Sequence, residues 1–130
     1  MYRTLVLLTT FLLASCGAEK LSPTEEQIQA TLDYIKTENS EVILDAVYNA
    51  GGVYNWVVSV RTDGTNRKGL ASAICNDLYS TGILTQENKS TTIDHGLRVV
   101  DAERFAATGG NYREASLGSA DCKTFQMFDM

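Results

Sequence analysis

The chain lacks the long apolar runs and the catalytic or metal-binding motifs that reveal the function of many proteins. Its longest apolar stretch, residues 5–14, covers about ten residues, whereas a membrane-crossing helix needs about 20. A single histidine and the absence of a CxxC pair argue against a zinc site. The HExxH, GxSxG and GxGxxG motifs are absent as well. We therefore expect no cofactor, and these absences leave the biochemical activity unidentified.

Basic residues are also scarce. Eleven lysines and arginines stand against sixteen acidic residues, which gives a formal net charge of −5. Nonspecific binding to nucleic acid depends on basic patches, so this composition argues against it. The chain has no internal repeat and no low-complexity segment, and its length suits one domain with one core.

The first residues form a leader with three parts. Arg3 is the only charged residue before Glu19, and an apolar stretch follows it. The stretch ends at the small residues Ala14 and Ser15, directly before Cys16. A basic start, a short apolar middle and a small-residue end are the parts of a secretory signal peptide.

Leu13-Ala14-Ser15-Cys16 resembles the lipobox of bacterial lipoproteins. The resemblance implies that the Cys16 thiol receives a diacylglycerol, that cleavage falls just before Cys16, and that the new amine often gains a further chain such as palmitate. It divides the protein into a signal peptide (1–15), a lipidated tether (16–22) and one domain (23–130). The alternatives are an ordinary signal peptide with Cys16 in a disulfide, or a buried N-terminal helix.

The resemblance also implies a location. Two or three acyl chains hold a protein at a bilayer surface without crossing it. Gly17 stands where, in Gram-negative lipoproteins, an Asp favours retention in the inner membrane, so the outer membrane is expected, with the domain facing the periplasm. Without residues 1–15, ten basic residues remain against sixteen acidic ones, a net charge of about −6.

Cys75 and Cys122 remain when Cys16 carries lipid. Two cysteines in an exported domain more often pair than not, so we expect a disulfide between them. Closing a loop of nearly fifty residues stabilises the fold by about 4 kcal/mol in the chain-entropy model. Two free thiols or a metal site are the alternatives.

Helical patterns dominate the N-terminal part of the domain. Ser22-Pro23-Thr24-Glu25 is a helix-start signal with a capping box from Ser22 to Glu25. The apolar residues that follow at helical spacing are Ile28, Leu32 and Ile35. Residues 40–50 also show helical spacing and end at Gly51-Gly52, so the sequence predicts an N-terminal helical hairpin.

The remaining patterns alternate between strand and helix. Residues 53–61 and 92–100 alternate apolar and polar side chains, which predicts strands, and residues 67–80 return to helical spacing. Residues 114–117 and 124–128 are expected to form short strands. A strand–helix–strand order predicts that the first two strands run parallel. The predicted fold class is α+β: a small mixed sheet with helices packed on one face, preceded by the hairpin.

Two groups of residues are candidates for a partner-binding site. Arg61, Arg67 and Lys68 gather positive charge near a predicted helix start, where backbone N–H groups attract anions. The alternative is a solvated loop, and the glycines around Arg67 and Lys68 do not match a P-loop. Trp56 alternates with valines and is expected in the core; only if exposed would it anchor a partner protein.

His95, beside Asp94 and near Asp101, is the one candidate for catalysis. Because it shares a strand face with Ile93 and Leu97, a partly buried structural histidine is the favoured interpretation. The favoured function is a non-enzymatic, membrane-anchored binding module for an envelope protein, peptidoglycan or an anionic lipid. The alternatives are an envelope inhibitor or exclusion protein against a toxin, lysozyme or phage, and a small hydrolase that uses His95.

Overall fold

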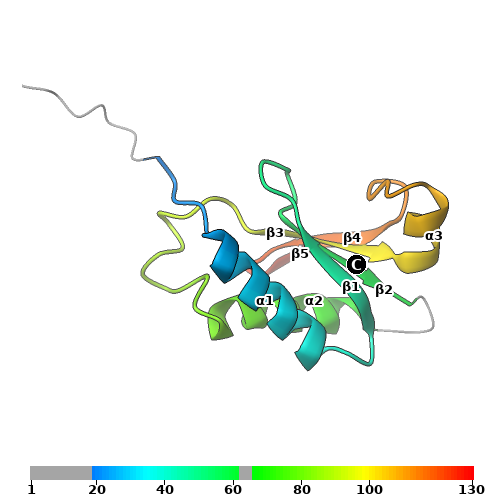
Figure 1. The fold of residues 1–130 in the computed structure, drawn as a ribbon, viewed down its shortest axis with the longest axis horizontal. Helices are drawn as coiled ribbons and strands as arrows, with labels where there is room; N and C mark the ends of the chain where they lie inside the picture. The colour runs from blue at the N-terminus through cyan, green and yellow to red at the C-terminus, as the bar shows by residue number, and fades with distance from the viewer. Residues whose placement is uncertain (1–18, 62–65) are drawn as a thin grey trace, which may run out of the picture.

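A five-stranded mixed sheet forms the centre of the domain, as the computed structural model shows for residues 19–61 and 66–130 (Figure 1). The strands lie in the order β1-β2-β3-β4-β5; β2 and β3 are parallel, as the sequence predicts, and the other pairs are antiparallel. In chain order the elements are α1 (Glu25–Glu38), β1 (Ile43–Tyr48), β2 (Trp56–Val60), α2 (Arg67–Ser80), β3 (Gly96–Asp101), α3 (Ala102–Ala107), β4 (Ser116–Asp121) and β5 (Gln126–Phe128). The fold class is therefore α+β.

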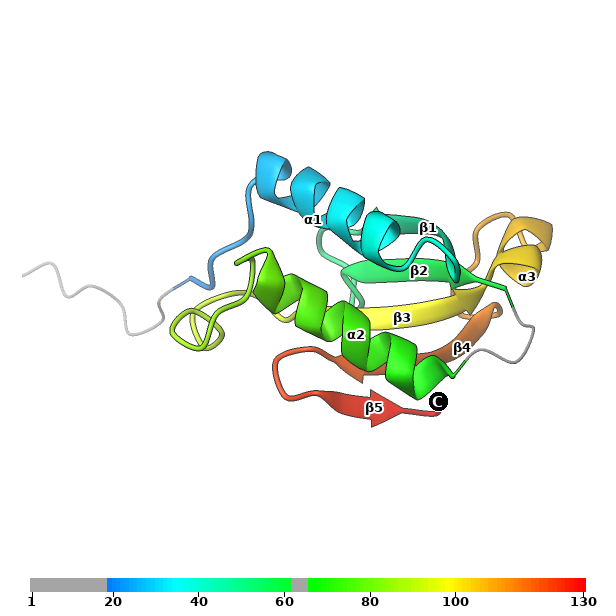
Figure 2. The same ribbon diagram turned by 90° about the horizontal axis from the view of Figure 1, so that it is seen from below.

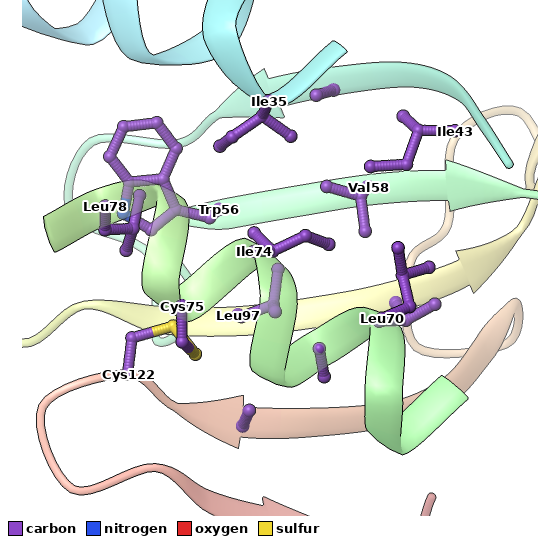
Figure 3. Close-up of a cluster of buried hydrophobic side chains, with 14 of the residues drawn as sticks. Ile35, Ile43, Trp56, Val58, Leu70, Ile74, Cys75, Leu78, Leu97 and Cys122 are labelled. Carbon is purple, nitrogen blue, oxygen red and sulfur yellow. A yellow bond between two sulfur atoms is a disulfide. The ribbon is translucent and has the colours of Figure 1, made fainter. Parts of the chain in front are cut away.

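The two long helices, α1 and α2, lie side by side over one face of the sheet (Figure 2). Trp56, Val58 and Leu97 point from β2 and β3 toward these helices and form the main core with Ile74 and its neighbours (Figure 3). Val99 of β3 belongs to the same core. Their buried neighbours Val57 and Val100 point to the opposite face, because side chains alternate along a strand.

The opposite face, which we call the open face, is only partly covered. Phe105 of α3 and Tyr112 of the following loop pack there against Val57 and Val100. The prediction that the helices pack on one face is therefore right for α1 and α2 and wrong for α3. The sequence analysis assigned no helix to residues 102–107; the Asp101 carboxylate begins this helix by accepting bonds from the amides of Glu103 and Arg104.

The predicted helical hairpin is wrong in its second half. Residues 43–48 form β1, which pairs with β2. A bulge between Ile43 and Asp45 interrupts the alternation, so that the buried residues Ile43 and Ala46 are three positions apart. This spacing imitates one face of a helix and explains the error.

The first helix is confirmed, but it begins later than predicted. Thr24 is the N-cap and forms a capping box with Gln27, in place of the box predicted between Ser22 and Glu25. The helix predicted at residues 67–80 is confirmed over the whole range and is capped by Asn66.

The expected disulfide between Cys75 and Cys122 is confirmed. It joins α2 to the end of β4, and both cysteines are fully buried (Figure 3). The signal peptide, Cys16 and Gly17 lie outside the described residues. Among the described residues, no helix is long and apolar enough to cross a membrane.

Candidate functional site

The predicted basic cluster is held to the fold through one of its members. Arg67 starts α2, and its guanidinium donates a hydrogen bond to the Leu117 carbonyl on β4 at 3.2 Å. Arg61 and Lys68 are exposed, and part of the segment that joins Arg61 to α2 lies outside the described residues. Arg67 thus fastens α2 to the sheet, while the prediction of a shared anion site stays a prediction.

Trp56 is a core residue, as the favoured interpretation held. Its side chain is 0% exposed, so it lacks the exposed surface that an anchor for a partner protein needs. The indole Nε1–H donates to His95 Nδ1 at 3.0 Å, and the Tyr48 ring packs edge-on against the indole. The bond links β2 to the segment before β3.

His95 is more deeply buried than the sequence predicts, at 0% exposure. Burial above all, together with the positive charge of Lys123, lowers its pKa from 6.5 to about 4, against the opposing effect of Asp94. The neutral ring accepts the indole proton on Nδ1, so Nε2 carries its hydrogen. Such a ring is a hydrogen-bond donor at Nε2, and near pH 7 it lacks the second proton that a general acid would give up.

The acids near His95 in sequence bind other partners. Asp94 is exposed and pairs with Lys20 at 3.3 Å and Lys123 at 3.4 Å, which together lower the pKa of its carboxyl, Lys20 most strongly. Asp101 caps α3. Within the described ranges, no cluster of three histidine, cysteine or acidic residues could hold a metal ion.

A cavity of about 200 Å³ lies beside His95. Tether residues Leu21 and Ser22, with Pro23, line one side, and Thr92 and His95 line another. Thr92 Oγ1 and His95 Nε2 are buried and have no hydrogen-bond partner among the residues that the structure describes. The cavity therefore holds two unpartnered polar atoms in a lining that is otherwise more apolar than polar, and the tether contributes to that lining.

The most distinctive polar group on the open face is Arg98 of β3. Its guanidinium carbon lies 4.0 Å from the centre of the Tyr54 ring and 5.8 Å from that of Tyr112. Cation–π attraction therefore helps to fix the side chain. Arg98 forms no ion pair in the part of the chain that the structure describes, and its buried Nε–H has no partner.

Two hydroxyl groups belong to the same cluster. Ser119 pairs with Arg98 in the β3–β4 register, so both side chains lie on the open face. The Ser119 hydroxyl lowers the pKa of the Tyr54 phenol more than burial raises it, and Arg98 lowers the pKa further. Arg98, Tyr54 and Ser119 thus offer hydrogen-bond donors in one place, and we call them, with Tyr112, the Arg98 site.

Gly96 makes room for this arrangement. A Cβ atom at Gly96 would lie 2.7 Å from the Val53 carbonyl oxygen and 3.2 Å from Tyr54 Cδ1. Only a residue without a side chain lets the segment before β2 pass so close to β3. Tyr54 falls within the strand predicted over residues 53–61, but the strand begins only at Trp56, and Tyr54 packs on the open face, opposite to Trp56.

An apolar groove of about 470 Å³ adjoins the Arg98 site. Val57 forms part of its lining, with Val47 of β1, Phe105 of α3 and Tyr112; the loop at Gly51-Gly52 lines its rim. Val57 is the register partner of Arg98 on the same face, and Tyr112 belongs to both the groove and the Arg98 site. We call this feature the open-face groove.

The sequence alone did not reveal the Arg98 site. Its one local signal is an arginine among valines in a predicted strand, a charge where a half-buried strand expects an apolar or small polar residue. Tyr54 and Tyr112 come from segments far from Arg98 in sequence, so no spacing rule connects them. No family model, curated protein or solved structure matches this chain.

Proposed function

We propose that this chain is a lipid-anchored lipoprotein of the cell envelope and acts as a non-enzymatic binding module, with the open face as its binding surface. The observation that carries the proposal is the combination on that face of a fixed, unpaired guanidinium and an adjoining apolar groove. Binding sites of this kind are concave and mostly apolar, with a few placed polar groups.

The anchor is supported by the lipobox and by the way the tether meets the domain. The Leu21 amide donates to the Thr91 carbonyl at 2.8 Å, and the Ile93 amide donates to the Leu21 carbonyl at 3.0 Å. Leu21 stands five positions after Cys16, and an extended chain reaches about 18 Å over that distance. A lipid on Cys16 would therefore hold this end of the domain close to the bilayer.

The two ends of the domain then have different surroundings. The segment before α1 and the loop before β3 lie at one end of the sheet, while the start of α2 and α3 lie at the other (Figures 1 and 2). The open-face groove runs along the side, between the loop at residues 49–52 and α3. It is thus accessible to an envelope component beside the anchored protein.

The environment of His95 favours a binding role over the hydrolase alternative. The ring has an indole as its partner on Nδ1, where a catalytic histidine has an orienting carboxylate. Of the nearby acids, Asp94 forms ion pairs with two lysines and Asp101 caps α3.

Photo-crosslinking in cells tests the proposed binding surface. A photoreactive amino acid replaces Tyr112 on the open face or, as the control, Gln29 on the exposed side of α1. We expect a discrete adduct with an envelope component from position 112, lost in the Arg98→Gln background, and none from position 29. Equal adducts from both positions, or none from position 112, would contradict the proposal.

The anchor is tested by fatty-acid labelling in cells. Cys16→Ser removes the thiol that would be acylated, so we expect the variant to incorporate no labelled fatty acid, whereas the natural chain incorporates it. Mass spectrometry of the native protein should show residues 1–15 removed and acyl chains on Cys16. A Cys16→Ser chain that still incorporates labelled fatty acid would contradict lipid anchoring through Cys16.

A further inference from the structure

The Arg98 site has the properties of a receptor for a singly charged anion. The domain carries an excess of acidic residues, yet Arg98 pairs with none of those described. The guanidinium carbon lies over the Tyr54 ring at 4.0 Å and over the Tyr112 ring at 5.8 Å, and the Arg98 Nε–H has no hydrogen-bond partner among the described residues, so it can donate to an added acceptor. A side chain held in this way loses little conformational freedom when it binds.

The charge of the site favours a carboxylate over a phosphate. The site supplies the single positive charge of one guanidinium beside the neutral hydroxyls of Tyr54 and Ser119. The Asp129 carboxylate, which acts on the pKa of Tyr54, adds negative charge nearby, and this disfavours an anion with two charges. A phosphate monoester carries close to two charges at neutral pH and is usually held by several cations. A carboxylate also accepts two parallel bonds from the fork of an arginine.

The groove determines which chemical group the ligand must carry next to its carboxylate. Val57 and Arg98 are register partners on adjacent parallel strands, which lie about 4.8 Å apart. A ligand that binds both must carry a small apolar group within a few bonds of its carboxylate. The C-terminal residue of a peptide has this arrangement, because its side chain and its carboxylate share one carbon atom.

The size of the groove favours a short peptide over a folded partner. Its volume of about 470 Å³ is in the range of small-molecule sites. A stable protein partner needs about 800 Å² of surface on each side. In the compartment implied by the lipobox, peptidoglycan carries short peptides that end in a free carboxylate beside a small apolar side chain.

We propose that the Arg98 site and the open-face groove bind the free carboxylate end of a peptidoglycan peptide. Arg98 holds the carboxylate, with the Tyr54 hydroxyl beside it, and the terminal side chain lies in the open-face groove. This inference rests on the proposed function, because it takes the open face as the binding surface and the envelope as the location.

The test uses the purified full chain in detergent and N-acetyl-D-alanyl-D-alanine as the probe. Binding is followed by NMR through the Arg98 Nε–H signal and through the amides of residues 110–112. We expect saturable shifts with the acid, at least tenfold weaker binding of its C-terminal amide, and weaker binding of the L,L acid. The comparison of acid and amide needs no variant and does not depend on the folding of one.

Two variants then test whether Arg98 is the residue that binds the carboxylate. Arg98→Gln should weaken binding of the acid at least tenfold, whereas Arg113→Gln, which removes an exposed arginine next to Tyr112, should change it less than twofold. No Arg98 shift at 10 mM acid, equal binding of acid and amide, or an equal effect of both variants would overturn the proposal. Tighter binding of the L,L acid would assign the site to protein C-termini instead, and tighter binding of inorganic phosphate would overturn the carboxylate assignment.

These outcomes separate the inference from the proposed function. If the peptide acid fails to bind while the Arg98-dependent crosslink at position 112 persists, only the ligand class is wrong. If the acid binds in solution but position 112 gives no adduct in cells, the role as an envelope binding module is wrong.

Discussion

His95 is a neutral imidazole inside the core, and its state is set by its neighbours. It has no exposed surface, accepts a bond from Trp56 and lies near the charge of Lys123. Each of these makes a positive charge on the ring unfavourable. In the unfolded chain the same imidazole has its ordinary pKa of about 6.5, so folding and protonation compete.

The free energy of unfolding should therefore fall in mild acid. Between about pH 6.5 and pH 4 the unfolded chain binds a proton at His95 that the folded chain does not, so stability is lost as the pH falls. The slope from this one group is at most about 1.4 kcal/mol per pH unit. Denaturant titrations across this range measure it.

His95→Gln is the matched variant for this prediction. An amide oxygen keeps an acceptor for the Trp56 indole, while the titrating group is removed. We expect the variant to be somewhat less stable at pH 7 and to show a flatter acid limb. An unchanged slope between pH 6.5 and pH 4 would assign the acid sensitivity to other groups.

Gly96→Ala tests the close approach that builds the open face. The added methyl would meet the Val53 carbonyl oxygen at 2.7 Å, which forces β3 and the segment before β2 apart. We expect a loss of about 1–3 kcal/mol in stability, together with a change in the NMR signals of Tyr54 and Arg98. A variant as stable as the natural chain would show that this contact is not under steric constraint.

At the scale of elements, the sequence pattern predicts some helices and strands correctly and others not. Residues 67–80 carry an unbroken helical stripe, and the prediction matches α2 throughout. β1 was mistaken for a helix because one bulge changes the spacing of its buried residues. β4 was only partly found, since Gly118 and Ser119 are poor strand formers and are held there by pairing with β3 and β5.

The disulfide makes a prediction at the same scale, because it joins α2 to β4. The two cysteines are 47 positions apart, so their bond removes about 4 kcal/mol of unfolded-chain entropy in the simplest model. We expect Cys75→Ala with Cys122→Ala to lower stability by about 2–4 kcal/mol, measured by denaturant unfolding. Dithiothreitol should destabilise the natural chain and leave the double variant unchanged; equal stability of the two proteins would contradict this view.

At the scale of the whole molecule, the tether connects the proposed anchor to the interior. Residue 21 pairs with the segment before β3, and the tether forms one wall of the cavity at His95. A change in the tether should therefore alter the solvent accessibility of His95.

Leu21→Pro removes the amide that donates to Thr91, whereas Leu21→Ala keeps it and changes only a side chain that is 65% exposed. With Leu21→Pro we expect at least tenfold faster hydrogen exchange at the Ile93 amide, and modification of His95 by diethylpyrocarbonate. Leu21→Ala should behave as the natural chain. Full protection of Ile93 in the proline variant would show that the docked tether is not needed to close the cavity.

The sequence by itself determined the features that depend on neighbouring residues: the lipobox resemblance, the stripe of α2, and the alternation that assigns Val57 and Val58 to opposite faces of β2. The tertiary structure decided which distant segments meet. It made residues 43–48 a strand, buried His95 against Trp56, and placed Tyr54 and Tyr112 around Arg98. The physical reason is that a periodic pattern reports the burial of a face, whereas a site is made by close contacts between segments that local spacing does not relate.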